Sequence, residues 1–209
     1  MKSKIRFLDC GANIGQTIDW FINNFQEYEF SIDSFEANPE LIPILKQKIR
    51  LIDESINLHE LAVDVEEGSK NFYLQSWGAR TGSSLVKGKE STSENEFIEV
   101  KTIDLPEWIK ENCSSDEFTI LKLDVEGTEY DIVKKIINNN IQNKIDVLLV
   151  EWTPVVKFSR NKPSLEKITN NQGLKSTAEE KFNLVLEWHD PDNCVVPLLN
   201  LIEQNIEKS

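Results

Sequence analysis

The sequence contains few of the residues that bind zinc or form disulfide bonds. It has two histidines and three cysteines among 209 residues. The cysteines Cys10, Cys113 and Cys194 lie far apart, and none belongs to a C-x-x-C pair. An odd number of widely spaced cysteines argues against a disulfide framework, and the lack of C-x-x-C argues against a structural zinc site. Because Cys10 follows an apolar segment, we expect it to pack in the core rather than act as a nucleophile.

Basic residues are also scarce. The 23 Lys and Arg residues face 36 Asp and Glu residues, which gives a net charge of −13. A non-specific nucleic-acid binder, or a protein that binds anionic membranes, needs a positive surface that this composition does not favour. The sequence also has no apolar run long enough to span a bilayer and no apolar signal-peptide region. We therefore expect a cytoplasmic protein that binds neither nucleic acid nor membrane.

Strand and helix patterns alternate along most of the chain. A first strand contains Ile5, Phe7 and Leu8, and further strands are predicted over residues 30–37, 57–63, 120–125, 146–151 and 184–188. Helices are predicted over residues 16–25, 39–51, 105–112, 128–138 and 197–204. This order predicts an α/β fold with a doubly wound, mostly parallel sheet that helices cover on both faces.

Residues 69–102 interrupt this alternation. Strand patterns over residues 71–75 and 96–102, with glycine-containing polar sequence between them, predict a β-hairpin insertion. We expect this hairpin to lie near the ligand-binding crevice at the carboxyl ends of the parallel strands. The aromatic residues Tyr73, Trp77 and Trp152 fall in segments that we place around the same crevice. No linker divides the chain, so residues 1–209 are expected to form one domain, with acceptor-side elements in residues 153–209. The sequence does not indicate an oligomeric state.

The most informative segment is Phe7–Gly15, in which a glycine-containing turn connects the first strand to the first helix. A strand, tight turn and helix form the cofactor-binding corner of doubly wound domains. A dinucleotide fingerprint requires G-x-G-x-x-G, but Asp9 and Ile14 occupy two of its glycine positions. Asp9 would repel a pyrophosphate, whereas it can bind an ammonium or hydroxyl group. The pattern therefore favours S-adenosylmethionine (SAM); a simple turn with a solvated aspartate is the alternative.

Two further acids end predicted strands. Ligands of open parallel sheets bind beyond the carboxyl ends of the strands. Glu36 lies at the end of the second strand, 25 residues after Gly11, where a carboxylate can accept hydrogen bonds from both hydroxyls of a ribose. Asp64 follows the third strand and is placed to bond an adenine amino group, although surface acids are common in loops.

A charged cluster is predicted at the next two strand ends. Strand periodicity places Lys122, Asp124 and Glu126 on one side, and Glu151 ends the strand expected beside them. Three carboxylates in one crevice suit Mg²⁺ or Mn²⁺, with Asp124, Glu126 and Glu151 as ligands. Without a metal, Asp124 can act as the general base, with Lys122 or His189 orienting it or sharing its role. A Lys–Asp ion pair and a helix-capping carboxylate provide the purely structural alternative.

These segments resemble one known family. Residues 7–17, 34–39, 61–68, 100–105 and 120–131 are similar to the FkbM family of SAM-dependent methyltransferases, and the K-x-D-x-E-G-x-E pattern ending at Glu129 is the most specific element. The resemblance implies a class I methyltransferase fold, with a seven-stranded sheet whose last strand is antiparallel. It also implies O-methylation of a sugar, glycan or other hydroxylated natural product. Residues after Trp152 match no family pattern, so the acceptor is left open.

The sequence predicts one set of residues for SAM binding and a second set for catalysis. The residues expected to bind SAM are Asp9, Gly11, Ala12, Asn13, Gly15, Gln16, Thr17, Glu36, Ala37, Asn38, Ala62, Val63 and Asp64. The residues expected to take part in catalysis are Asp124, Lys122 and His189. The alternatives are a nicotinamide-dependent reductase, which the interrupted glycine pattern disfavours, and a non-catalytic protein with a SAM-binding fold.

Overall fold

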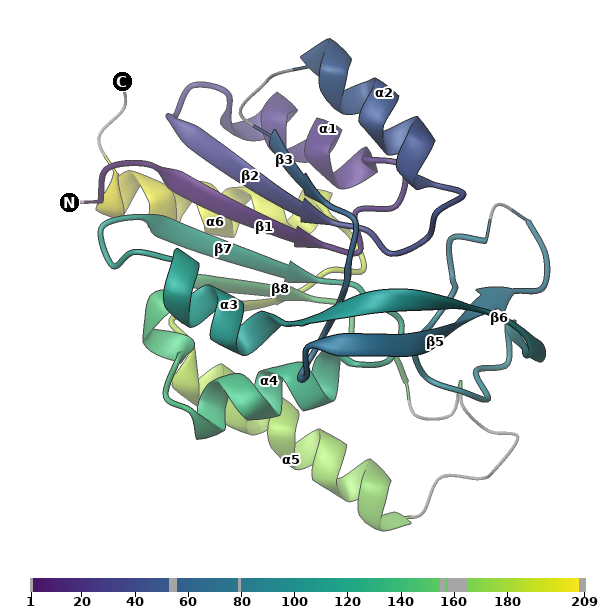
Figure 1. Cartoon of the computed structure of the whole chain (residues 1–209). Coiled ribbons are helices and arrows are strands. Elements are labelled where there is room, and N and C mark those ends of the chain that lie inside the picture. The colour runs from purple at the N-terminus through teal and green to yellow at the C-terminus, as the bar shows by residue number, and fades with distance from the viewer. Residues whose placement is uncertain (1, 53–55, 79, 155–156, 158–164, 207–209) are drawn as a thin grey trace.

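The computed structural model of the chain describes residues 2–52, 56–78, 80–154, 157 and 165–206. A central sheet lies between two groups of helices, and a smaller sheet extends from one end (Figure 1). The elements are β1 (Ile5–Cys10), α1 (Gln16–Phe25), β2 (Phe30–Phe35), α2 (Ile42–Ile52), β3 (Ile56–His59), β4 (Ala62–Asp64), β5 (Gly68–Gln75), β6 (Thr92–Asp104), α3 (Leu105–Asn112), β7 (Phe118–Leu123), α4 (Glu129–Asn138), a short 3₁₀ helix (Gln142–Lys144), β8 (Val147–Val150), α5 (Leu165–Lys181), β9 (Val185–Glu187) and α6 (Asp192–Asn205).

The central sheet has the strand order β3-β2-β1-β7-β8-β9, and all its paired strands are parallel. This confirms the predicted α/β, Rossmann-like fold. The strand order reverses at β1, which pairs with β2 on one side and with β7 on the other, so their carboxyl ends meet. The family resemblance predicts a seven-stranded sheet whose last strand is antiparallel, and this prediction is wrong for the described residues. There the sheet has six strands, and β9 pairs with β8 in the parallel direction.

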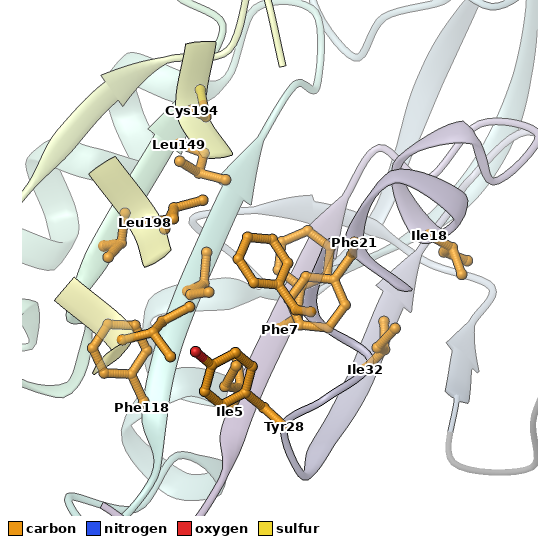
Figure 2. Packing of buried hydrophobic residues seen from close by; sticks show 14 of the residues in the cluster. Ile5, Phe7, Ile18, Phe21, Tyr28, Ile32, Phe118, Leu149, Cys194 and Leu198 are labelled. Carbon is orange, nitrogen blue, oxygen red and sulfur yellow. The ribbon is translucent and has the colours of Figure 1, made fainter. Parts of the chain in front are cut away.

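Each face of the central sheet carries its own apolar core. On one face, Phe7 of β1 stacks on Phe21 of α1, with ring centroids 4.5 Å apart (Figure 2). The same cluster includes Leu198 of α6. Cys10 points to the opposite face and packs in a cluster with α3, α4 and α5, because successive strand residues alternate between faces. Cys10 is fully buried, as expected for a packing residue.

The predicted hairpin is confirmed and belongs to a second sheet. β5 and β6 pair in the antiparallel direction, and β4 adds to β6 in parallel, giving the order β4-β6-β5. The single strand predicted over residues 57–63 is therefore wrong. Residues 56–59 belong to the central sheet, whereas residues 62–64 pair with residues 102–104. Local sequence does not reveal this change because the partner of β4 lies about forty residues further along the chain.

Two helices differ from their predicted extents, and a third helix was not predicted. α2 begins at Ile42 rather than Pro39, because the residues before it form a turn in which the Asn38 side chain accepts the Glu40 N–H. α6 begins at Asp192 and contains Pro197 in its interior, although proline favours a first turn. α5 was not predicted, since its polar sequence gives only a weak apolar periodicity. Among the described residues, no helix is both long and apolar enough to cross a bilayer.

Candidate active site

A cavity opens where the carboxyl ends of β1, β2 and β7 meet the small sheet. Its empty volume, including the space open to solvent, is about 780 Å³. Both sheets contribute to its wall. The described lining residues are Gly11, Asn13, Phe35, Glu36, Ala37, Asn38, Leu41, Leu61, Ala62, Val63, Phe72, Arg80, Thr81, Ser83, Leu85, Asp124, Val125, Glu126 and Glu151.

The turn after β1 has the backbone conformation that its sequence predicts. Gly11 and Gly15 have φ values of 82° and 83°, and Asn13, a residue that tolerates left-handed backbone, has 55°. Gly11 also meets a packing requirement of the fold. A Cβ atom on Gly11 would lie 1.9 Å from the carbonyl oxygen of Asp124. Gly11 is therefore required because the backbone at the end of β7 packs against it, independently of any ligand.

Glu36 holds two turns together at the base of the cavity. Its Oε2 accepts the Asn13 N–H at 2.8 Å, and its Oε1 accepts the Asn38 N–H at 2.7 Å. Burial raises the pKa of the Glu36 carboxyl, and these two donors offset that effect only in part. Because each carboxylate oxygen can accept more than one hydrogen bond, Glu36 can still receive two hydroxyl groups from a ligand.

Lys122 is a buried cation beneath the turn. Its ammonium donates to the carbonyl of Gly11 at 2.8 Å and lies 3.2 Å from Asp9 Oδ1 and 3.6 Å from Asp124 Oδ2. Burial acts to lower the pKa of Lys122, but the two carboxylates outweigh it and raise that pKa. The ammonium is thus fixed by structural partners. Lys122 positions Asp124, whose side chain is 30% exposed and lines the cavity.

Glu126 connects the loop after β7 to the insertion. Its carboxylate lies 2.5 Å from the Nζ of buried Lys89, and its carbonyl accepts the Ser84 hydroxyl at 2.6 Å. Its φ of 62° is unusual for a residue with a side chain. Strained backbone of this kind persists only where surrounding contacts fix it, and the two contacts from the insertion provide that constraint.

The three acids at the ends of β7 and β8 line the same cavity, as expected. Burial raises the pKa of Glu151, and the charges of Asp124 and Glu126 raise it further. The predicted metal site is not supported, however. Among the described residues, no group of three or more His, Cys, Asp or Glu side chains is arranged to hold a metal ion. His189 is exposed, and the described cavity wall does not include it.

The predicted SAM-binding residues divide into two sets. Gly11, Asn13, Glu36, Ala37, Asn38, Ala62 and Val63 line the cavity. Asp9, Ala12, Gly15, Gln16, Thr17 and Asp64 do not belong to its described wall. Asp9 is fully buried against Lys122, and Asp64 ends β4, where its carboxylate is 2.5 Å from Lys70. Both acids thus lie next to lysines outside the described cavity wall, and the adenine contact of Asp64 stays a prediction.

Several lining residues were not predicted. Arg80, Thr81, Ser83 and Leu85 follow β5 in a stretch whose sequence predicts a loop, and no periodicity or motif distinguishes them. They reach the site through tertiary contacts alone. The three aromatic residues expected near the crevice differ in exposure: Tyr73 and Trp152 are buried, whereas Trp77 is exposed.

Glu129, the last acid of the K-x-D-x-E-G-x-E pattern, holds the loop that carries Asp124 and Glu126. Its Oε1 accepts the N–H groups of Val125 and Gly127 at 3.1 and 3.0 Å, and the Thr153 hydroxyl at 3.2 Å. Its Oε2 is buried with no hydrogen-bond partner among the described residues. Burial raises the pKa of Glu129 to about 7, although the backbone donors act in the opposite direction.

The raised pKa of Glu129 predicts a pH-dependent stability. The free energy of unfolding should fall by about 3 kcal/mol from pH 4.5 to pH 7, because the unfolded state releases this proton first. Urea titrations of the wild type and Glu129→Gln at several pH values measure this contribution. The wild type should lose about 3 kcal/mol more than the variant over that range. Equal pH slopes would show that Glu129 ionises normally.

Comparisons with known proteins identify the family. The family model described as "Methyltransferase FkbM domain" matches residues 9–189. A crystal structure of Methyltransferase FkbM from Methylobacillus flagellatus KT, at 2.20 Å resolution, is 12% identical with a TM-score of 0.45. The alignment covers 97% of this chain but 38% of that chain, so this chain spans little more than a third of its length. No curated protein matches significantly. Because the family model covers most of the sequence, this chain belongs to the FkbM methyltransferase family.

Proposed function

We propose that the chain is a SAM-dependent O-methyltransferase whose acceptor is a hydroxyl group of a sugar, a glycan or a small natural product. Membership of a methyltransferase family supports methyl transfer as the reaction. The negative charge of the cavity is the observation that supports SAM as the methyl donor. Four carboxylates line the described wall, those of Glu36, Asp124, Glu126 and Glu151. Arg80 is the one cation of that wall, and its guanidinium already pairs with Glu40 and Glu96.

An acidic cavity discriminates between possible cofactors. A dinucleotide brings a pyrophosphate, which four carboxylates would repel. SAM carries a sulfonium and an ammonium group, which the same carboxylates attract. The residues present also fit the rest of the molecule: Glu36 has free lone pairs for a ribose diol, and Phe35, Leu61 and Val63 offer apolar surface to a base. The nicotinamide-dependent alternative is disfavoured for this reason.

When bound, SAM supplies a methyl group on a sulfonium, which an acceptor oxygen can take up by direct displacement. The chain has to hold the acceptor in line and receive the hydroxyl proton. Asp124 is suited to receive that proton, since it lines the cavity and Lys122 and the backbone contact at Gly11 fix its position. Glu36 would hold the donor at the base of the cavity, and Thr81, Ser83 and Leu85 of the insertion form part of the cavity wall.

Two measurements test this proposal. Calorimetry should detect binding of SAM and of its demethylated product, and no binding of NADH. An assay with radiolabelled SAM and a panel of glycans and small alcohols should then detect transfer to at least one hydroxyl compound. Binding of NADH without SAM binding would overturn the proposal, and methylation of a nucleic acid with all alcohols inert would overturn its acceptor class.

The affinity for SAM should depend on Glu36. In Glu36→Ala, the loss of a charged acceptor for two hydroxyls should weaken binding by about 2–3 kcal/mol, roughly 30- to 150-fold. Calorimetry with SAM measures this change, and circular dichroism verifies that the variant is folded. Glu66→Ala serves as the control, because the Glu66 side chain is 73% exposed and lies outside the described cavity wall. Unchanged affinity in folded Glu36→Ala would show that the nucleoside binds elsewhere.

A further inference from the structure

A second cavity adjoins the proposed donor cavity. It has an empty volume of about 770 Å³ and opens beneath the loop that connects β5 and β6. Its described lining residues are Gln75, Trp77, Thr81, Gly82, Lys89, Glu90, Ser91, Glu126 and Lys157. Thr81 and Glu126 line both cavities. The two spaces are thus neighbours that share the side chains of Thr81 and Glu126.

Trp77 distinguishes this second cavity from other parts of the surface. It is 61% exposed, whereas Trp152 and Trp188 are buried and Trp20 and Trp108 are partly buried. The ring stands directly before Gly78, whose φ is 69° and whose surroundings are open. An aromatic ring at the rim of a polar cavity offers a flat apolar face beside hydrogen-bonding groups. The C–H face of a sugar ring complements such a surface, because its hydroxyls remain free to bond at the edge.

The charges of this cavity favour a neutral ligand. Lys89 and Lys157 are balanced by Glu90 and Glu126, and the ammonium of Lys89 is 2.5 Å from the Glu126 carboxylate. Gln75 and Ser91 add uncharged polar groups. A phosphate or carboxylate ligand would need an excess of cations, which neither this cavity nor the net charge of −13 provides.

Hydrogen bonds hold the loop around Trp77 in place. The N–H of Ser76 donates to the Ser91 carbonyl at 2.9 Å, and the N–H of Gly82 donates to Gln75 Oε1 at 2.9 Å. Lys89 Nζ donates to the Gly82 carbonyl at 2.8 Å. A loop fixed in this way loses little conformational entropy when a ligand binds. The backbone is therefore held at Ser76, directly before Trp77, and again at Gly82.

We propose that the second cavity is the acceptor subsite and that it holds a neutral saccharide packed against Trp77. This inference rests on the proposed methyltransferase function. The saccharide directs one hydroxyl past Thr81 and Glu126 into the donor cavity. There its oxygen forms the new bond to the methyl carbon, the carbon–sulfur bond of the donor breaks, and the hydroxyl proton passes to Asp124. The products are a methyl ether and the neutral thioether of the donor.

Fluorine NMR of the chain labelled with 5-fluorotryptophan tests saccharide binding without turnover. The Trp77 resonance is assigned by its loss in Trp77→Phe. The probes are methyl glycosides of neutral hexoses and deoxyhexoses and their disaccharides. At least one should shift the Trp77 resonance in a saturable manner. No shift with any of them would overturn the inference, as would a shift produced by sugar phosphates alone.

Steady-state kinetics with the saccharide that binds provide the second arm. Trp77→Ala should raise its KM roughly tenfold or more, Trp77→Phe should restore part of the loss, and the Kd for SAM should stay within about twofold. Phe97→Ala is the matched control, since Phe97 is an exposed aromatic residue of the same hairpin outside both described cavity walls. An unchanged KM in Trp77→Ala would overturn the subsite. Failure to bind SAM would instead overturn the proposed function.

Discussion

Replacing Lys122 with methionine is expected to lower the free energy of unfolding by about 3–5 kcal/mol. Lys122 is 1% exposed and lies 3.2 Å from Asp9, which is fully buried. Its removal leaves the Asp9 carboxylate in the core without a counter-ion, and it also removes a donor to the Gly11 carbonyl. Methionine has a similar volume, so the loss reports on charge rather than on a void. Urea denaturation followed by circular dichroism measures the change.

Two further variants separate the causes of this loss. Adding Asp9→Asn to Lys122→Met removes both charges, and the double variant should recover a substantial part of the stability. Lys48→Met removes a partly exposed lysine that pairs with Asp19, and it should cost less than about 1 kcal/mol. If Lys122→Met were as mild as Lys48→Met, the ion pair under the turn would not be buried in solution.

Replacing Asp124 with asparagine should lower turnover by roughly 100-fold or more while the affinity for SAM stays within a few-fold. Asparagine preserves the shape of the side chain but cannot accept the acceptor proton. The backbone of Asp124 is held by the Cys10 carbonyl at 3.2 Å and by its packing on Gly11, so the loop should keep its conformation. Single-turnover kinetics with labelled SAM measure the methyl-transfer step directly.

The control for this experiment is Asp131→Asn, which changes an exposed acid on α4. It should leave both turnover and SAM affinity unchanged. Turnover near that of the wild type in Asp124→Asn would remove this residue from the mechanism and direct attention to Glu126 and Glu151, which line the same cavity.

Local sequence was sufficient to predict the strand, turn and helix at the carboxyl end of β1. The bounds of α1 and α3 agree with their predictions because each helix follows a clear start signal and has a regular apolar face. Glu36 and Asp124 reach one cavity because parallel strands end at the same edge. These features depend on residues close together in sequence, or on a rule that holds for all doubly wound sheets.

The remaining features depend on contacts between distant residues. The separation of β3 from β4 follows from pairing with β6, and the contact of Lys89 with Glu126 joins two loops that share no sequence pattern. The burial of Asp9 and Asp64 beside Lys122 and Lys70 likewise depends on contacts between residues that no local pattern connects. An acid at a strand end therefore predicts the position of the sheet edge. It does not predict whether the carboxylate faces the cavity or pairs with a lysine of the fold.

The short outer strands of the central sheet affect how the protein behaves at high concentration. β3 has four residues and β9 has three, and among the described residues these two strands form the borders of the central sheet. Another chain can add a strand to an open edge through backbone hydrogen bonds. The length of the edge strand limits how many of these bonds can form. Because both edge strands are this short, intermolecular strand addition at either border gains few backbone hydrogen bonds. The central sheet therefore resists strand addition at these two borders, although neither strand contains the proline or lysine residues that often protect longer edges.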